Sequence, residues 1–235
     1  MSVADNIARV REQMAAAARR AGRSPDSVTL MAVSKTFPAE CIQEAYAAGA
    51  RVFGENRVQE FVGKFSAVRD LPGARYHLIG HLQSNKAAKA AELFHAIDSV
   101  DSLKLAERLN TAAAALGENL AILLEVNVGG EVAKSGMSPD SPEIVAILEA
   151  APRLINLEIR GLMTVPPFTE DPESARPYFR QLRELRDRLA LRNFPAITLA
   201  ELSMGMSHDF AVAIEEGSTC VRLGTAIFGA RTKAG

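Results

Sequence analysis

Short apolar segments alternate with longer amphipathic segments along almost the whole chain, and this alternation limits the fold more than any other sequence feature. Eight segments rich in Val, Ile and Leu have the length of strands: 28–34, 51–53, 76–79, 94–97, 121–126, 157–163, 199–203 and 220–223. Seven segments between them have helical periodicity: 38–48, 56–68, 84–92, 102–116, 141–150, 173–191 and 208–216. Such alternation indicates βα units around a parallel sheet.

The number of predicted strands favours closure of the sheet into an α/β (β/α)₈ TIM barrel. Eight strands in 235 residues are near the usual size of that fold. A doubly wound open sheet is the alternative, but no GxGxxG motif follows a strand and opens a helix. We predict one domain over residues 1–235, with an added amphipathic helix at 1–22 and the barrel at 28–229.

Composition and charge exclude several classes of protein. The net charge is −1, which gives no electrostatic reason to expect binding to nucleic acid or to a membrane surface. No apolar run reaches the ~20 residues of a membrane span, and the first residues have no signal-peptide pattern. Cys41 and Cys220 are far apart and are expected to be buried thiols in a reducing compartment. We therefore expect a cytoplasmic protein, and a monomer.

Lys35 is the sharpest candidate for chemistry, because it directly follows the first predicted strand. In a TIM barrel the functional residues lie at the carboxyl ends of the strands. A lysine amine that is partly removed from water there has a lowered pKa and can attack an aldehyde. The alternative is a lysine that extends to solvent from the end of a strand.

Arg222 lies within the eighth predicted strand, which neighbours the first strand in a closed barrel. The two-residue period of a strand places Cys220, Arg222 and Gly224 on one face. A buried guanidinium needs an anion or another acceptor to compensate its desolvation. That partner is either a ligand or a strand-end acid, of which three are available: Glu55, Glu125 and Glu201.

Two glycine-containing segments follow the seventh and eighth predicted strands. They are 203–207, with sequence SMGMS, and Gly224-Thr225. The corresponding loops of TIM barrels commonly bind phosphate through backbone N–H groups. Glycine permits a close approach of the backbone, and the hydroxyl groups of Ser203 and Thr225 add donors.

Other polar residues at predicted strand ends leave alternatives open. Asn56 follows the second strand, where it is either a helix N-cap or a contact to a ligand. His77 and His81 lie four residues apart, but no third ligand accompanies them, so we do not expect a metal site. The sequence assigns no role to either histidine. No nucleophile elbow and no Walker loop are present.

A lysine on strand one, an arginine on strand eight and phosphate loops after strands seven and eight together resemble the fold-type III pyridoxal phosphate proteins. The sequence is most similar to the pyridoxal phosphate homeostasis protein family, single-domain relatives of the alanine racemase barrel. The matching stretches run in family order: AVSKT (32–36), FGEN (53–56), HLIG (77–80), LQSNK (82–86), KSGM (134–137), GLMT (161–164), LSMGMS (202–207) and VRLGTAIFG (221–229). Tyr76 and His81 depart from the family pattern.

The resemblance implies that Lys35 holds pyridoxal 5′-phosphate as a Schiff base, that Asn56 lines the cofactor ring and that Arg222 faces the pyridine nitrogen. It further implies a phosphate cradle after strands seven and eight: Ser203, Met204, Gly224 and Thr225. These residues are expected to bind the cofactor, and none is expected to be catalytic.

The role that the resemblance implies is intracellular homeostasis of the cofactor, which the protein would buffer or deliver, with cofactor-dependent apo-enzymes as recipients. An arginine at the pyridine nitrogen gives up no proton readily, which makes the cofactor a weaker electron sink. The similar racemases also use a tyrosine from a further domain, whereas this sequence ends soon after the eighth strand. The alternatives are a racemase or lyase of low activity and, less well matched, a Schiff-base aldolase or phosphosugar isomerase.

Overall fold

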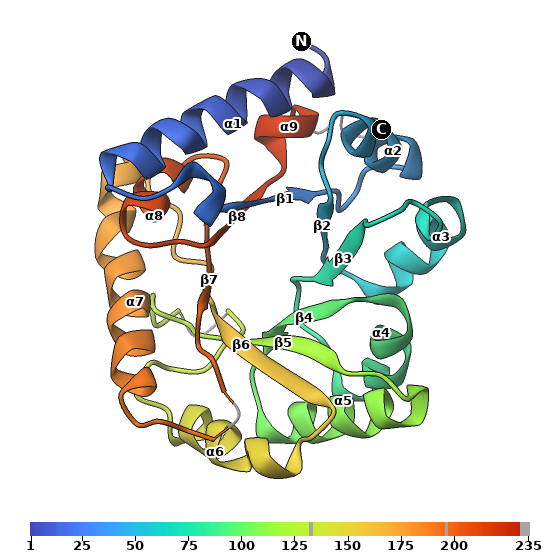
Figure 1. Ribbon diagram of the computed structural model, residues 1–235, viewed down its shortest axis with the longest axis vertical. Helices are drawn as coiled ribbons and strands as arrows, with labels where there is room; N and C mark the ends of the chain where they lie inside the picture. Colours follow the sequence, from blue (N-terminus) through green and yellow to red (C-terminus); the bar gives the residue numbers. More distant parts are fainter. Residues whose placement is uncertain (132–133, 196, 231–235) are drawn as a thin grey trace.

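Eight parallel strands close into a barrel in the computed structural model, which describes residues 1–131, 134–195 and 197–230. The strands are β1 (Thr29–Val33), β2 (Val52–Glu55), β3 (Arg75–Leu78), β4 (Ala96–Val100), β5 (Leu120–Glu125), β6 (Leu157–Met163), β7 (Glu201–Met206) and β8 (Cys220–Leu223). Each strand pairs with the next one in the sequence, and β8 returns to pair with β1 (Figure 1). The predicted TIM barrel is confirmed, and the open-sheet alternative is wrong.

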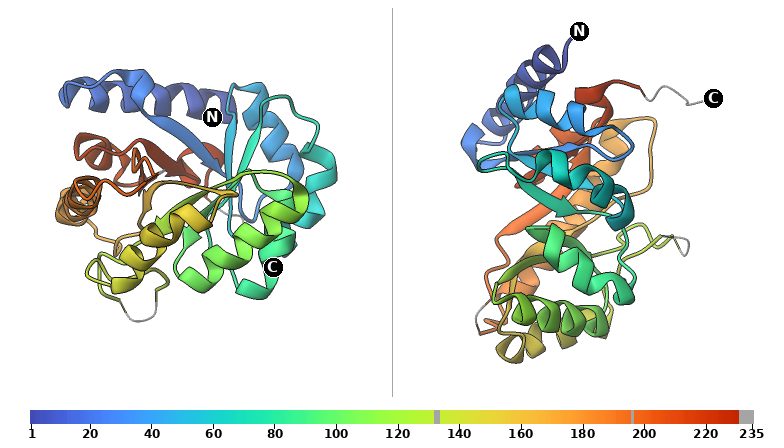
Figure 2. Two further views of the ribbon diagram at one scale, coloured as in Figure 1. Left: turned by 60° about the horizontal axis from the view of Figure 1, so that its bottom comes forward. Right: turned by 90° about the vertical axis from the view of Figure 1, so that its right-hand side faces the viewer.

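The helices surround the barrel as an outer ring (Figure 2). They are α1 (Val3–Arg20), α2 (Ala39–Ala47), α3 (Val58–Val68), α4 (Ala87–Leu93), α5 (Leu103–Leu116), α6 (Pro142–Ala150), α7 (Arg176–Ala190), α8 (Phe210–Glu215) and α9 (Thr225–Phe228). Of the helices in the described residues, none combines the length and the apolar character needed to span a membrane.

Local signals explain where these elements form. All six residues of β5 are buried, because one face lies inside the barrel and the other lies under the helices. In α5 the Ser102 hydroxyl caps the first turn by accepting from the N–H of Leu105, and Gly117 ends the helix in the left-handed conformation. Leu105 and Leu109, four residues apart, place the apolar stripe of this helix against the barrel.

The N-terminal helix α1 lies outside the barrel, along α8 and α9 (Figure 1). Its predicted apolar stripe is confirmed, since Ile7, Val10 and Met14 are all buried. The amide nitrogen of Asn6 donates to the backbone oxygen of Ile227 in α9 (2.8 Å). This helix therefore packs next to the segment that follows β8.

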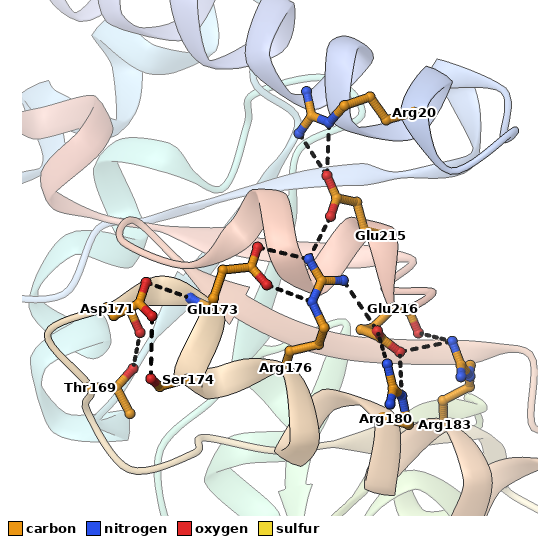
Figure 3. A network of polar contacts seen from close by, with 10 residues as sticks. All are labelled: Arg20, Thr169, Asp171, Glu173, Ser174, Arg176, Arg180, Arg183, Glu215 and Glu216. Carbon is orange, nitrogen blue, oxygen red and sulfur yellow. Dashed lines mark hydrogen bonds and ion pairs between the residues drawn. The ribbon is translucent and has the colours of Figure 1, made fainter.

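A network of ion pairs joins α1, α7 and the end of α8 (Figure 3). Glu215 contacts Arg20 of α1 at 2.8 Å and Arg176 of α7 at 2.7 Å. Glu216, which is 4% exposed, contacts Arg176 and two further arginines of α7, Arg180 and Arg183. Exposed ion pairs contribute little individually, but here several converge on one buried carboxylate.

The predicted bounds of β4 and β7 differ most from the structure. The segment predicted to begin at residue 94 begins at Ala96, because Phe94 ends α4 and stacks on Phe61 of α3 at a centroid distance of 4.8 Å. The strand predicted at 199–203 is β7, which runs to Met206. Apolar character alone does not distinguish the last turn of a buried helix from the start of a strand.

Candidate functional site

A cavity of about 550 Å³ opens at the carboxyl ends of the strands. It is lined by residues from seven of the eight strand ends or the loops after them: Val33, Lys35, Asn56, Ile79, Gly80, His81, Glu125, Val126, Lys134, Ser135, Val165, Phe168, Met206, Ser207, His208, Arg222, Gly224 and Thr225. This volume lies within the range of small-ligand sites, and its position is that of TIM-barrel active sites.

Lys35 lines this cavity two residues after the end of β1, and it is half-buried. Both of its neighbours in the sequence form hydrogen bonds to glutamate side chains that do not line the cavity. The Ser34 hydroxyl donates to Oε1 of Glu55 (2.8 Å), and the N–H of Thr36 donates to Oε1 of Glu60 (2.5 Å). Thr36 has a φ of 67°, a left-handed conformation that is strained for a β-branched residue. The backbone that carries Lys35 is therefore constrained on either side.

A second lysine, Lys64 of α3, connects these constraints. Its Nζ donates to the backbone oxygen of Ser34 (3.0 Å), to Glu55 (3.0 Å) and to Glu60 (2.6 Å). Lys64 is 9% exposed and Glu55 is fully buried, on the face of the sheet that is turned toward α3. The sequence indicated only a helical position for Lys64, and its role depends on how α3 packs on the barrel.

The pKa values of the two carboxylates in this cluster, Glu55 and Glu60, are shifted in opposite directions. Burial raises the pKa of Glu55, and the nearby charge of Lys64 only partly opposes that effect. Burial also acts to raise the pKa of Glu60, but hydrogen bonds from Lys64 and from the N–H of Thr36 lower it below its ordinary value. The cluster thus contains one carboxylate whose ionised form is favoured and one whose ionised form is disfavoured by burial.

Arg222 lines the cavity from β8 and is 3% exposed. Its guanidinium donates to the Ser203 hydroxyl (2.8 Å) and to the backbone oxygen of Thr164 (2.7 Å). An ion pair with Glu55, Glu125 or Glu201 was the sequence alternative. Within the described residues no carboxylate lies in salt-bridge range of Arg222, and Glu55 pairs with Lys64 instead.

The segment at 203–207 differs from the predicted loop. Ser203 and Met204 lie inside β7 with no exposed surface, Ser203 bonded to Arg222 and Met204 in the hydrophobic core. Neither side chain lines the cavity, whereas Met206 and Ser207 do. The prediction placed the end of this strand too early, because SMGMS has the composition of a turn. Binding of a cofactor by Ser203 and Met204 stays a prediction.

Gly224 and Thr225 line the cavity at the start of the short helix α9, where the sequence placed them. The hydroxyl of Ser207 accepts from the N–H of Ala226 (3.2 Å), so the segments after β7 and β8 are in direct contact. This contact brings together the two loops that were predicted to cooperate.

Asn56 also lines the cavity, and it does not cap a helix. The N-cap of α3 is Arg57, and β2 extends through Glu55. Gly80 packs against the backbone of Asn56 so closely that a Cβ at position 80 would lie 2.4 Å from the oxygen of Asn56. Asn56 is therefore placed where it can contact a ligand, which was the second alternative from the sequence.

Glu125, at the end of β5, is a lining residue that the sequence considered only as a possible partner of Arg222. Glu125 is 6% exposed, and its Oε1 accepts a hydrogen bond from the hydroxyl of Ser135 (3.0 Å). Oε2 is buried and has no hydrogen-bond partner among the described residues. No sequence signal distinguishes this acid from other acids at strand ends.

The two histidines of the third βα unit lie in different places. His77 is inside the barrel, with Nδ1 3.1 Å from Oδ1 of the buried Asp98. His81 is at the rim of the cavity, with Nδ1 3.3 Å from Asp101. In the part of the chain that the structure describes, no group of three or more His, Cys, Asp or Glu side chains has the arrangement of a metal site.

Comparison with known sequences gives a consistent family. The family model for the N-terminal domain of alanine racemase matches residues 6–232. The pyridoxal phosphate homeostasis protein of Aquifex aeolicus is 46% identical over 231 residues, which cover 98% of this chain and 99% of that protein. The homeostasis protein of Pseudomonas aeruginosa is 47% identical over 230 residues, with coverage of 98% and 96%.

Solved structures with the same barrel include close and distant relatives. PipY of Synechococcus elongatus, solved with PLP bound, has a TM-score of 0.84 at 42% identity, covering 97% of this chain and 100% of that chain. An alanine racemase from Clostridium difficile has a TM-score of 0.70 at 16% identity, and the match covers 58% of that longer chain. The second comparison shows a shared fold alone.

Proposed function

We propose, because this chain belongs to the pyridoxal phosphate homeostasis protein family of alanine racemase-like barrels, that it binds pyridoxal 5′-phosphate through a Schiff base on Lys35. The observation that carries the proposal is the presence of Lys35 and Arg222 in one cavity, on the adjacent strands β1 and β8. When bound, the cofactor supplies an aldehyde that reacts reversibly with primary amines.

The donors of the cavity fit such a molecule. The amine of Lys35 would hold the aldehyde carbon, and the guanidinium of Arg222 would face the pyridine nitrogen. Arg222 is held by Ser203 and Thr164, so it needs no carboxylate to stay in place. An arginine beside the ring nitrogen keeps that nitrogen unprotonated, because guanidinium groups rarely lose a proton.

A phosphate would lie where the segments after β7 and β8 meet. Gly224 and Thr225 line that part of the cavity together with Ser207, whose hydroxyl accepts from the N–H of Ala226. Backbone N–H groups at such turns bind phosphate well. Asn56 would contact the ring from β2. We retain Ser203 and Met204 in the proposed set, Ser203 through its bond to Arg222 and Met204 through its position in β7.

We infer that the protein holds and delivers the cofactor and is not an efficient enzyme. Racemisation needs a second acid or base on the opposite face of the substrate, usually a tyrosine in the racemases of this fold. None of the three tyrosines lines the cavity: Tyr46 donates to the oxygen of Pro72, Tyr76 donates to the oxygen of Val68, and Tyr178 lies in α7. Apo-enzymes in the cytoplasm are the proposed recipients, and the proposed unit is one monomeric domain.

The visible absorbance of the purified protein tests this proposal. Wild type is expected to show the band of a pyridoxal phosphate Schiff base, and Lys35→Ala is expected to lose it. Borohydride reduction followed by mass spectrometry should place the cofactor on the peptide that contains Lys35. Lys104→Ala, a change at an exposed position of α5, is the control. A band that survives in Lys35→Ala, or amino-acid turnover at about 1–10³ per second, would overturn the proposal.

A further inference from the structure

The cavity contains one buried acceptor that the proposed cofactor does not explain. Oε2 of Glu125 has no hydrogen-bond partner among the described residues, although Glu125 is 6% exposed and lines the cavity. A buried carboxylate oxygen without a donor is costly, and such atoms are rare in folded proteins. A group that enters the cavity and donates to this oxygen would remove that cost.

The position of Glu125 is built into the fold. Oε1 accepts from the Ser135 hydroxyl, and the N–H of Met137 donates to the backbone oxygen of Glu125 (2.9 Å). Gly136, at φ 103°, packs against the side chain so closely that a Cβ there would lie 3.2 Å from Cγ of Glu125. The described residues of the loop after β5 thus fix the position of the carboxylate, and none of them donates a hydrogen bond to Oε2.

The charges around the cavity indicate which ligand would satisfy Oε2. Glu125 is the only acid among the described residues that line the cavity. The printed contacts of the basic lining residues go to other groups: Arg222 bonds to Ser203 and Thr164, Lys134 contacts Glu131, and His81 contacts Asp101. The phosphate of the proposed cofactor is an anion and would be repelled by an ionised Glu125. A cationic donor, with N–H groups, complements it.

We propose that Glu125 and Ser135 form a subsite for the ammonium group of an incoming primary amine, in the same cavity that Lys35 lines. This inference rests on the proposed function, because the amine is the group to which a Schiff-base cofactor would pass. Free amino acids and the lysine side chains of recipient proteins share this chemistry.

The subsite would serve the exchange of the cofactor from Lys35 to the incoming amine. An ammonium group must first lose one proton, and the carboxylate of Glu125 accepts it. With the cofactor bound on Lys35, its C=N bond to Nζ would be replaced by a C=N bond to the incoming nitrogen, which would pass its two hydrogens to Nζ. No oxidant, reductant or water is consumed. Burial raises the pKa of Glu125, against the hydrogen bond from Ser135, so its carboxylate is a better base than an exposed one.

The first measurement follows loss of the Lys35 band while methylamine is added to the cofactor-loaded protein. In wild type the rate is expected to saturate with amine concentration, as binding precedes exchange. Glu125→Gln keeps the shape but not the charge, and its half-saturating concentration is expected to rise about tenfold or more. Glycine and a lysine-containing peptide in separate titrations distinguish the two sources of amine, and saturation by either supports the subsite.

The second measurement needs no cofactor. Calorimetric titration of the cofactor-free protein with methylammonium is expected to show binding in wild type and a loss in Glu125→Gln. Tetramethylammonium has the same charge and no N–H group, so it is expected not to bind. Glu158→Gln is the matched control, because Glu158 is an exposed acid on the neighbouring strand β6, at the opposite end of the barrel.

The outcomes separate this inference from the proposed function. Equal saturation in wild type and Glu125→Gln overturns the subsite, as does equal binding of tetramethylammonium. A shifted absorbance band in Glu125→Gln with unchanged amine saturation also overturns it, because Glu125 would then contact the cofactor itself. Survival of the band in Lys35→Ala instead overturns the proposed function, whatever Glu125 does.

Discussion

Nζ of Lys64 lies 3.0 Å from the backbone oxygen of Ser34, so a buried second lysine holds the residue that precedes Lys35. The same amine contacts Glu55 and Glu60, and Glu60 accepts from the N–H of Thr36. The position of the proposed Schiff-base lysine is therefore set by a polar cluster outside the cavity, between the barrel and α3.

Replacement of Lys64 by methionine is expected to destabilise the fold. It leaves the buried Glu55 and the oxygen of Ser34 without their shared donor, and breaking a buried pair costs about 3–5 kcal/mol. Urea unfolding measures this loss. Lys89→Met removes an exposed ion pair with Glu92 and is expected to change the unfolding free energy by less than about 1 kcal/mol. A Lys64→Met cost as small as that of Lys89→Met would contradict the argument.

Arg222→Lys tests the two hydrogen bonds of the strand-eight guanidinium. A single ammonium cannot reproduce both bonds, to Ser203 and to Thr164, in the same geometry. We expect a loss of about 1–3 kcal/mol in unfolding free energy, together with weaker binding of pyridoxal phosphate by absorbance titration. Arg153→Lys, at an exposed ion pair, should alter neither quantity. Unchanged cofactor affinity in Arg222→Lys would remove Arg222 from the proposed site.

Gly161→Ala is expected to strain the barrel where β6 meets β7. A Cβ at position 161 would lie 1.9 Å from the backbone oxygen of Glu201, so the strands must move apart. Overpacking of this kind costs about 1–3 kcal/mol or more. Gly63→Ala is the opposite case, because Gly63 is in α3 with open space around it, and about 0.5–1 kcal/mol of stabilisation is expected. Thermal unfolding of both variants checks the predicted difference in sign.

Protonation of Glu216 in acid is expected to make the fold less stable. Burial acts to raise the pKa of Glu216, but hydrogen bonds from Arg180 and Arg176 and the charges of Arg180 and Arg183 lower it overall from 4.5. A carboxylate with a lowered folded-state pKa adds stability above its unfolded-state pKa, and this is lost as the pH falls through the folded-state value. The stability difference between wild type and Glu216→Gln should therefore be largest near neutral pH and shrink below about pH 4.5.

Urea unfolding across this pH range measures the effect of Glu216. Glu12→Gln, on the exposed face of α1, is expected to leave the curve of stability against pH unchanged. A difference between wild type and Glu216→Gln that does not depend on pH would mean that the arginines of α7 stabilise the fold through packing and not through the charge of Glu216.

The sequence by itself determined the barrel and the two residues that anchor the proposed site. Periodicity is a local property, so eight apolar segments separated by helical ones predict the fold without knowledge of any contact. Closure makes the first and last strands neighbours, and the two-residue period of a strand places Arg222 on one face with Cys220 and Gly224. Lys35 and Arg222 line one cavity for these reasons. The start of β4 was misplaced because a buried helix end and a buried strand have the same apolar composition, and the end of β7 was misplaced because SMGMS has the composition of a turn.

The tertiary structure alone decided which polar groups meet. Lys64 reads as an ordinary helical lysine until the packing of α3 brings it to Glu55 and Ser34. Glu125 reads as a partner for Arg222 until Ser135 bonds to its Oε1, while Oε2 has no hydrogen-bond partner among the described residues. Burial and hydrogen bonding depend on side chains from separate elements that close together in three dimensions. No spacing within one segment encodes them.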